Sequence, residues 1–386
     1  MQGLRRLDIL KRHFTAVAKM DAPEIIHKVC NGNALLVTLN RPAKLNALTM
    51  NMIDGLNDVF NNIVLQDQVD VVLLEGAGGK AFCAGGDVAR VRLSGLKQLP
   101  ENEGGDGLTR NFFEQEYKLN NIIGLQQKAP QVSIWDGITM GGGVGISVHG
   151  KYRICTEKTL FAKPETAIGL FPDVGGSYFL SRLDGGLGLY IGLTGARLNA
   201  HDLIYSGIAT HFVPTRRIEP LRSELLAFGT NDSVEEIIDK YSEDVAGSLG
   251  SLKGGSSLEN NRSSIDRCFA QASCEDVYKA LEEESTEWSK SVVKTLSPFS
   301  PMSIKQTFKL IELAHGKSLS ECLQMEFDLV QHIVDDVNSD FYEGVRAVLV
   351  DKDRNAQWPE GKTIYDISEE QVLKKFEPIE KRLVFP

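Results

Sequence analysis

Two glycine-rich segments constrain the fold more than any other feature of this chain. Residues 81–87 read AFCAGGD, and residues 139–145 read TMGGGVG. Each follows an apolar run, 71–74 or 132–135, that predicts a buried strand, and each precedes a helical pattern. Glycine at such a turn lets a ligand approach the backbone, and the start of a helix presents unpaired N–H groups. Two such groups that converge on one point would form an oxyanion hole.

Either segment alone is also compatible with a plain tight connection in an α/β domain. The segment that starts at Gly141 does not fit the dinucleotide pattern G-x-G-x-x-G, because its sixth position is Ile146. The chain also lacks the phosphate-loop pattern G-x-x-x-x-G-K-S/T. These two segments therefore do not predict a phosphate-binding loop.

A third segment, residues 163–176 (KPETAIGLFPDVGG), contains two carboxylates, Glu165 and Asp173, among mostly apolar residues, glycine and proline. Carboxylates in such surroundings are candidates for acid–base or nucleophilic chemistry. Asp173 follows Pro172 and is also compatible with a turn or a helix cap.

Glu116 is a further candidate, on grounds of helical periodicity. It shares one face of a predicted helix with Phe112, Leu119 and Ile123. A carboxylate on a core-facing stripe is costly unless it meets a partner. A functional partner in a site would satisfy it, and a pairing with Arg110 or a rim position near solvent is the alternative.

These segments resemble the crotonase, or enoyl-CoA hydratase/isomerase, superfamily. The resemblance runs from about residue 24 to residue 214 and includes LNRP at 39–42, NAL at 46–48 and LTG at 193–195. Within the superfamily, residues 113–121, 141–150 and 164–176 are similar to the 3-hydroxyisobutyryl-CoA hydrolase branch. The resemblance implies an α/β fold, a crotonase-like spiral of ββα units with a C-terminal helical region.

The resemblance also assigns roles to particular residues. Gly86 and Gly142 would supply the oxyanion-hole amides, and Glu165 and Asp173 would be the catalytic acids. Glu116 would contact the substrate, as would Gly142, Glu165 and Asp173. Glu165 would either attack the thioester carbonyl or activate water as a general base, and the sequence does not separate these routes.

Two departures from the hydratase pattern favour the hydrolase branch. A hydratase would carry a catalytic carboxylate where this chain has Gly145, and a glycine where it has Asp173. The implied reaction is hydrolysis of a short branched 3-hydroxyacyl-CoA thioester, with 3-hydroxyisobutyryl-CoA of valine breakdown as the favoured substrate. A hydratase or isomerase of the same fold and a catalytically silent acyl-CoA-binding protein remain the alternatives.

Composition limits the other classes of function. A net charge of −10 argues against a nucleic-acid partner, and no apolar run approaches the ~20 residues of a membrane span. The six cysteines lack C-x-x-C spacing, which favours reduced thiols, with a packing role for Cys83 in the first glycine segment. No histidine cluster predicts a metal site. No cofactor is implied, since coenzyme A is part of the substrate, and Lys44, Arg90 and Arg92 are candidates to hold its phosphates.

The chain divides into four predicted parts. Residues 1–19 are basic and amphipathic, as in mitochondrial targeting segments, although an ordinary basic helix fits too and a cytoplasmic location is the alternative to the mitochondrial matrix. Residues 20–245 form the β/α core, 246–262 a Gly/Ser-rich loop, and 263–386 a mainly helical region. The oligomeric state stays open, and a homo-oligomer is compatible with the sequence.

The periodic patterns support stacked β/α units in the core. Strand patterns at 34–39, 71–74 and 132–135 alternate with helical patterns at 52–64, 108–126 and 143–149, and further helical patterns occur at 303–315 and 319–334.

Overall fold

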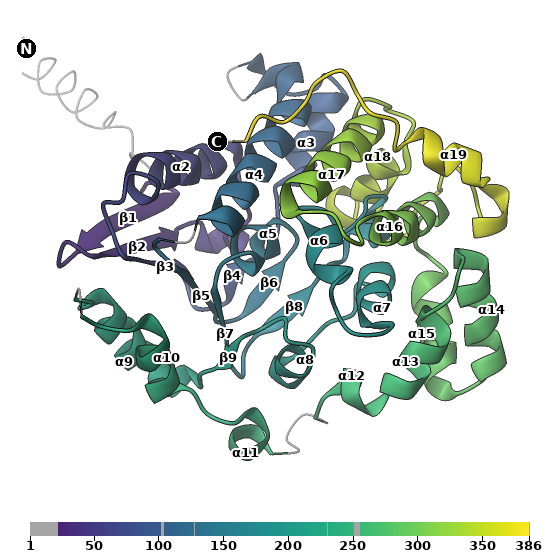
Figure 1. Cartoon of the computed structure of the whole chain (residues 1–386). Coiled ribbons are helices and arrows are strands. Elements are labelled where there is room, and N and C mark those ends of the chain that lie inside the picture. The colour runs from purple at the N-terminus through teal and green to yellow at the C-terminus, as the bar shows by residue number, and fades with distance from the viewer. Residues whose placement is uncertain (1–21, 102–103, 127, 230, 251–254, 386) are drawn as a thin grey trace, which may run out of the picture.

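The computed structural model describes residues 22–101, 104–126, 128–229, 231–250 and 255–385 (Figure 1). The predicted targeting segment 1–19 lies outside these residues. The strands are β1 (Ile25–Cys30), β2 (Ala34–Leu39), β3 (Val71–Gly76), β4 (Ala81–Cys83), β5 (Gln131–Trp135), β6 (Ile138–Met140), β7 (Tyr152–Cys155), β8 (Leu160–Ala162) and β9 (His211–Phe212).

Helices occupy most of the remaining described chain. The α-helices are α2 (Met50–Val59), α3 (Val88–Gly95), α4 (Leu108–Leu125), α5 (Gly142–Val148), α6 (Gly176–Leu180), α7 (Leu187–Thr194), α8 (Ala200–Tyr205), α9 (Thr215–Leu226), α10 (Val234–Tyr241), α11 (Val245–Leu249), α12 (Ser257–Asn260), α13 (Arg262–Phe269), α14 (Cys274–Glu284), α15 (Glu287–Leu296), α16 (Pro301–Leu313), α17 (Leu319–Val334), α18 (Asp340–Val345) and α19 (Glu369–Lys374). Short 3-10 helices cover Pro42–Lys44, Gly105–Gly107, Glu165–Ile168 and Ile364–Asp366, and π-helical turns cover Phe60–Val64 and Arg346–Val350.

From β3 onward, consecutive strands alternate between two sheets, which makes the chain a spiral. Within the described residues, one sheet has the order β1-β2-β3-β5-β7-β9 and the other the order β4-β6-β8. All neighbours are parallel except β1 and β2. From β3 to β8, each turn of the chain therefore adds one strand to each sheet, and the predicted α/β spiral of ββα units is confirmed.

The larger sheet is apolar on both faces because helices cover both. On one face, Val71 and Leu73 of β3 pack in a cluster with Leu221 of α9 and Ile238 of α10. On the other face, Val72 and Leu74 join the main core. This explains the uninterrupted apolar run in β3, since a parallel sheet covered on both sides needs no polar face.

The C-terminal helices lie against the spiral core of the same chain. Figure 1 shows α17 beside α4, and the two helices pack along each other, while α16 packs against α6 and α7 and α18 against α3. Gly344 of α18 packs directly against the backbone of Ile168, and a Cβ on Gly344 would overlap the carbonyl group of Ile168. The C-terminal region therefore contacts the 3-10 helix that begins with Glu165. Among the described residues, no helix has both the length and the apolar character that crossing a bilayer requires.

The prediction of a Gly/Ser-rich loop over 246–262 is wrong in part. Helix α11 starts after Asp244, whose carboxylate accepts the N–H of Gly247, and α12 starts after Ser256, whose hydroxyl accepts the N–H of Glu259. Side-chain caps of this kind stabilise short helices despite glycine and serine in the sequence.

Asn46 fixes the loop that leads from the first hairpin to the glycine segment at 81–87. The residue is fully buried with φ of 55°, its Oδ1 accepts the N–H of Arg41 at 2.9 Å, and its Nδ2 donates to the carbonyls of Ala77 at 3.0 Å and Ala81 at 2.9 Å. Asparagine tolerates this left-handed backbone better than other residues with a side chain. The NAL segment is thus a structural clamp on the strand that precedes Gly85 and Gly86.

Asn46→Ala should lower the free energy of unfolding by about 2–4 kcal/mol, because one buried and two partly buried backbone groups lose their partners. Urea unfolding measures the loss. Asn51→Ala, at an exposed position of α2, is the matched control and should change stability by less than about 0.5 kcal/mol. Equal stability of the two variants would contradict the clamp.

Candidate active site

The two glycine segments lie side by side because they follow neighbouring parallel strands. β4 pairs with β6, so their carboxyl ends meet at one edge of the small sheet. Gly85 has φ of 114° and Gly141 φ of 51°. A Cβ on Gly141 would lie 3.2 Å from the Cα of Gly85, so the two turns are in contact where glycine is required.

The amides of Gly86 and Gly142 are close together and available. The N–H of Leu48 donates to the carbonyl of Gly85, and its carbonyl accepts the N–H of Asp87, both at 2.8 Å. Because backbone groups of successive residues in such a pairing point to opposite sides, the N–H of Gly86 points away from Leu48. A Cβ on Gly142, the first residue of α5, would lie 3.4 Å from the nitrogen of Gly86. Neither amide has a hydrogen-bond partner within the described chain. The pair can therefore serve as oxyanion donors, as predicted, and their role stays a prediction.

Glu165 lies beside these amides. It begins the 3-10 helix after β8, and its Oε1 is 3.5 Å from the point where a Cβ on Gly141 would lie. The side chain is buried, and its oxygens accept no hydrogen bond from the described residues, although Nζ of Lys163 is 2.8 Å from Oε1. Burial raises the pKa of Glu165 to about 7; the Lys163 ammonium opposes this shift and the Asp173 charge adds to it.

Asp173 faces the same cluster and does not cap a helix through its side chain. Its Oδ2 accepts the hydroxyl of Tyr117 at 3.0 Å, and its Oδ1 lies 3.6 Å from Nζ of Lys163. Burial raises the pKa of Asp173, against the effects of Lys163 and Tyr117. Only its backbone carbonyl serves the turn, by accepting the N–H of Gly176 at 2.9 Å.

Glu116 is brought to the same place by α4. It is buried, its Oε1 has no hydrogen-bond partner in the described chain, and a Cβ on Gly142 would overlap that oxygen. The alternative pairing with Arg110 does not occur, because that guanidinium binds Gln331 at 3.1 Å and Asp335 at 3.0 Å. Burial, with the Asp173 and Glu165 charges, raises the pKa of Glu116 well above its usual value, although Lys163 lowers it.

The sequence interpretation missed Lys163 as a member of this cluster. Its side chain is completely buried, and Nζ donates to the carbonyl of Asp173 at 3.1 Å while pairing with both catalytic candidates. Burial alone would lower its pKa, but the charges of Glu165 and Asp173 hold that pKa above the usual value. The sequence did contain a signal for this role, because Lys163 directly follows a buried strand and precedes Glu165 by two residues.

A second residue that sequence reasoning missed is Glu326 on α17. This fully buried carboxylate accepts the N–H groups of Gly175 at 2.7 Å and Ser177 at 3.0 Å, and the Ser177 hydroxyl at 2.5 Å. It therefore caps α6 and ties the turn after Asp173 to the C-terminal region. Burial raises the pKa of Glu326 to about 8. No local pattern marks it, because its partners lie about 150 residues earlier in the chain.

Val174 gives a physical reason for glycine at position 145. Val174 has φ of 55°, a strained conformation for a β-branched residue, and its carbonyl is held by Nε2 of His149 at 2.8 Å. Burial lowers the pKa of His149 to about 4, so the ring is neutral and Nε2–H donates. The Val174 side chain occupies the space where a Cβ on Gly145 would lie. A carboxylate at that position, as in the hydratase pattern, has no room here.

A cavity of about 390 Å³ leads toward Gly86. Asp87, Arg90, Leu108 and Phe112 line it, and a Cβ on Gly86 would lie 2.9 Å from the Phe112 ring. Of the three predicted phosphate contacts, Arg90 lines this cavity. Nε of Arg92 instead donates to the carbonyl of Tyr342 at 2.9 Å, and Lys44 is exposed and is not among the lining residues.

Cys83 is buried against Gly143, and burial raises the pKa of its thiol to about 12. A thiol with such a pKa is a poor nucleophile. Its environment fits the predicted packing role.

Comparison with known proteins identifies relatives along nearly the whole chain. A protein family described as enoyl-CoA hydratase/isomerase matches residues 34–376. The chain is 42% identical to a protein of Danio rerio named 3-hydroxyisobutyryl-CoA hydrolase, mitochondrial, over 99% of this chain and 96% of the relative. It is 38% identical to the protein of the same name from Mus musculus, over 98% and 95% of the two chains.

Two solved structures share the fold at similar coverage. A crystal structure titled carnitinyl-CoA dehydratase, from Mycobacterium thermoresistibile, is 33% identical with a TM-score of 0.83, over 94% of this chain and 99% of that one. A structure titled enoyl-CoA hydratase, from Rhodobacter sphaeroides, is 30% identical with a TM-score of 0.80, over 94% and 100%. By the extent of the family match and by these relatives, the chain belongs to the enoyl-CoA hydratase/isomerase family.

Proposed function

We propose that this protein hydrolyses 3-hydroxyisobutyryl-CoA to 3-hydroxyisobutyrate and coenzyme A, a step of valine breakdown. The observation that carries the proposal is the placement of Glu165 and Asp173 beside two unpaired glycine amides, while Val174 fills the space next to Gly145. The full-length relatives named 3-hydroxyisobutyryl-CoA hydrolase support this substrate.

In the proposed reaction the thioester carbonyl binds with its oxygen at the amides of Gly86 and Gly142. Attack on the carbonyl carbon moves negative charge to that oxygen, and preorganised N–H donors stabilise it; loss of one such donor costs roughly 10²–10³-fold in rate. The C–S bond then breaks and coenzyme A leaves as a thiolate. No separate cofactor takes part, because the chain's own groups and water suffice.

Glu165 in its ionised form starts the reaction by either of two routes. It takes a proton from the attacking water, or it attacks the carbonyl itself and forms an anhydride that water opens. Asp173, held by Tyr117 and Lys163, would orient the water. Glu116 is buried beside the amide of Gly142 with its Oε1 free of a partner in the described chain, so it can form a hydrogen bond with the substrate's hydroxyl.

The cavity lined by Arg90 and Phe112 is the proposed entry for the coenzyme A arm, because it leads to Gly86. We also propose a mitochondrial location. Several relatives carry that word in their names, and the basic segment 1–19 fits it.

Glu165→Gln should reduce thioester hydrolysis by about 10²–10⁴-fold, since the variant loses the carboxylate that activates the attacking water or attacks the carbonyl itself. Thiol release from 3-hydroxyisobutyryl-CoA measures the rate, and coenzyme A binding and thermal stability should stay near those of the parent. Glu283→Gln, an exposed change on α14, is the control. Turnover of Glu165→Gln within a few-fold of the parent would refute the role.

The pH dependence should report the ionisation of Glu165. Because its pKa is raised to about 7 and the ionised form is active, kcat/KM should fall tenfold per pH unit below about pH 7 and level off above it. The Lys163 ammonium lowers that pKa, so Lys163→Met should move the inflection to higher pH. Lys279→Met, at an exposed position, should leave the profile unchanged. An inflection that stays in place in Lys163→Met would contradict this assignment.

Gly145→Ala should lower both activity and stability, although alanine normally stabilises a helix interior by about 0.5–1 kcal/mol relative to glycine. The added Cβ would overlap Val174 and displace the turn that carries Asp173. Adding Val174→Gly removes the obstruction and the strained valine, so the double variant should recover thiol release. A fully active single variant would show that this contact does not position Asp173.

Crotonyl-CoA, followed by ultraviolet absorbance, should not be hydrated by the parent, and hydration at a rate comparable to thiol release would favour the hydratase alternative.

A further inference from the structure

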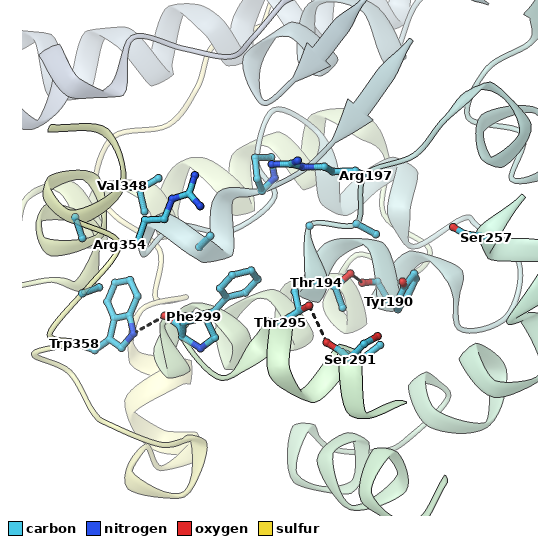
Figure 2. Close-up of a pocket in the computed structure, with 18 of the residues that line it drawn as sticks. Tyr190, Thr194, Arg197, Ser257, Ser291, Thr295, Phe299, Val348, Arg354 and Trp358 are labelled. Carbon is cyan, nitrogen blue, oxygen red and sulfur yellow. Dashed lines mark hydrogen bonds between the residues drawn. The ribbon is translucent and has the colours of Figure 1, made fainter. Parts of the chain in front are cut away.

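A second cavity, of about 660 Å³, lies behind the 3-10 helix that begins with Glu165. It is bounded by α7, by α15 and by the segment 347–358 (Figure 2). Pro164 and Ala167 form part of its wall, whereas the Glu165 side chain faces Gly141 on the other side. The volume is within the range of about 300–1,000 Å³ typical of small-molecule sites. This cavity shares no lining residue with the one that leads to Gly86.

Two unpaired cations line this cavity. Arg197 follows α7 and Arg354 follows the π-helical turn Arg346–Val350, and their guanidinium groups point toward each other in Figure 2. Neither group has a hydrogen-bond or ion-pair partner within the described chain, and no lining residue is an aspartate or glutamate. By contrast, nearby Arg346 pairs with Glu343, Asp351 and Asp353.

The lining of this cavity contains two positive charges and no negative charge, although the chain as a whole has a net charge of −10. Both arginines are exposed, so solvent screens their mutual repulsion, and what an anion bound between them gains is charge-assisted hydrogen bonds to both guanidinium groups. Guanidinium groups are suited to the oxygens of phosphate. The first requirement on a ligand is therefore an anionic group with several oxygens.

Four aromatic rings also line this cavity. Nε1 of Trp358 donates to the carbonyl of Pro298 at 3.1 Å, and Tyr190 and Trp288 contact each other with ring centroids 5.8 Å apart. Phe299 also lines the cavity, and Figure 2 shows it near Trp358. Rings held in place before binding offer stacking surfaces at low entropic cost. The second requirement on a ligand is a planar ring.

We infer that this cavity is a binding site for an aromatic organic phosphate of the nucleotide class, with Arg197 and Arg354 on the phosphates and the aromatic rings against the base. The site is additional to the proposed thioesterase centre and does not depend on that function. A ligand bound in this cavity would contact Pro164, which precedes Glu165, and Ala167 of the same 3-10 helix.

The tryptophans provide a direct readout. Two of the chain's three tryptophans, Trp288 and Trp358, line the cavity, and the third, Trp135, is fully buried elsewhere. Titration of the full chain with ADP should quench tryptophan fluorescence in a saturable manner. Trp358→Phe should reduce the amplitude of that change.

Arg197→Met and Arg354→Met should each raise the dissociation constant for ADP about tenfold or more, with unchanged thermal unfolding and thiol release. Arg90→Met is the matched control, because ADP is also a part of coenzyme A and Arg90 lines the substrate cavity. This variant should leave the quenching titration unchanged.

Adenosine and inorganic phosphate, as separate probes, should each bind at least tenfold more weakly than ADP. The inference is overturned if ADP causes no quenching at millimolar concentration, or if quenching is weakened by Arg90→Met and not by the other two variants. Phosphate that binds as tightly as ADP would overturn the assignment of a nucleotide-class ligand. These outcomes concern only the binding of ADP, whereas the proposed hydrolase activity is tested by thiol release, so failure of one proposal is distinguishable from failure of the other.

Discussion

The site depends on one buried ammonium group. Lys163 is the only cation found beside three buried carboxylates in the described chain, Glu116, Glu165 and Asp173. An unpaired buried charge is strongly unfavourable, so this lysine makes burial of Glu165 and Asp173 possible. Burial raises the pKa of each of the three acids, and Lys163 acts in the opposite direction on all of them. For Glu165 the result is a pKa of about 7, in the range that acid–base chemistry near neutral pH requires.

The C-terminal region is part of this site, because it holds the turn that presents Asp173. Glu326 binds the amides that follow that turn, and His149 holds the carbonyl of Val174 in a strained conformation. Strain of about 1–3 kcal/mol persists only where surrounding contacts enforce it. The C-terminal helices thus contribute to the geometry of the reaction centre and do more than cover it.

Local patterns were sufficient to predict the elements that bear the site. The strand at 34–39 and the helix at 319–334 occur with the predicted bounds, since their apolar periodicity reflects burial on known faces. Glu116, Glu165 and Asp173 lie together, as the resemblance implied. Lys163 and Glu326 were missed because their significance arises from contacts between distant elements. The helices within 246–262 were missed because single capping residues determine them.

The fold does not determine the reaction in this family. Solved structures with TM-scores of 0.80 and 0.83 carry the titles of a hydratase and a dehydratase, whereas the curated relatives are named hydrolases. Function must therefore be argued from the site. In this chain the Val174 side chain fills the space beside Gly145, and the turn that bears Val174 also presents Asp173. The same turn thus removes the place for a hydratase-type carboxylate and supplies a different carboxylate, which shares Lys163 with Glu165. This difference in the site favours hydrolysis over hydration.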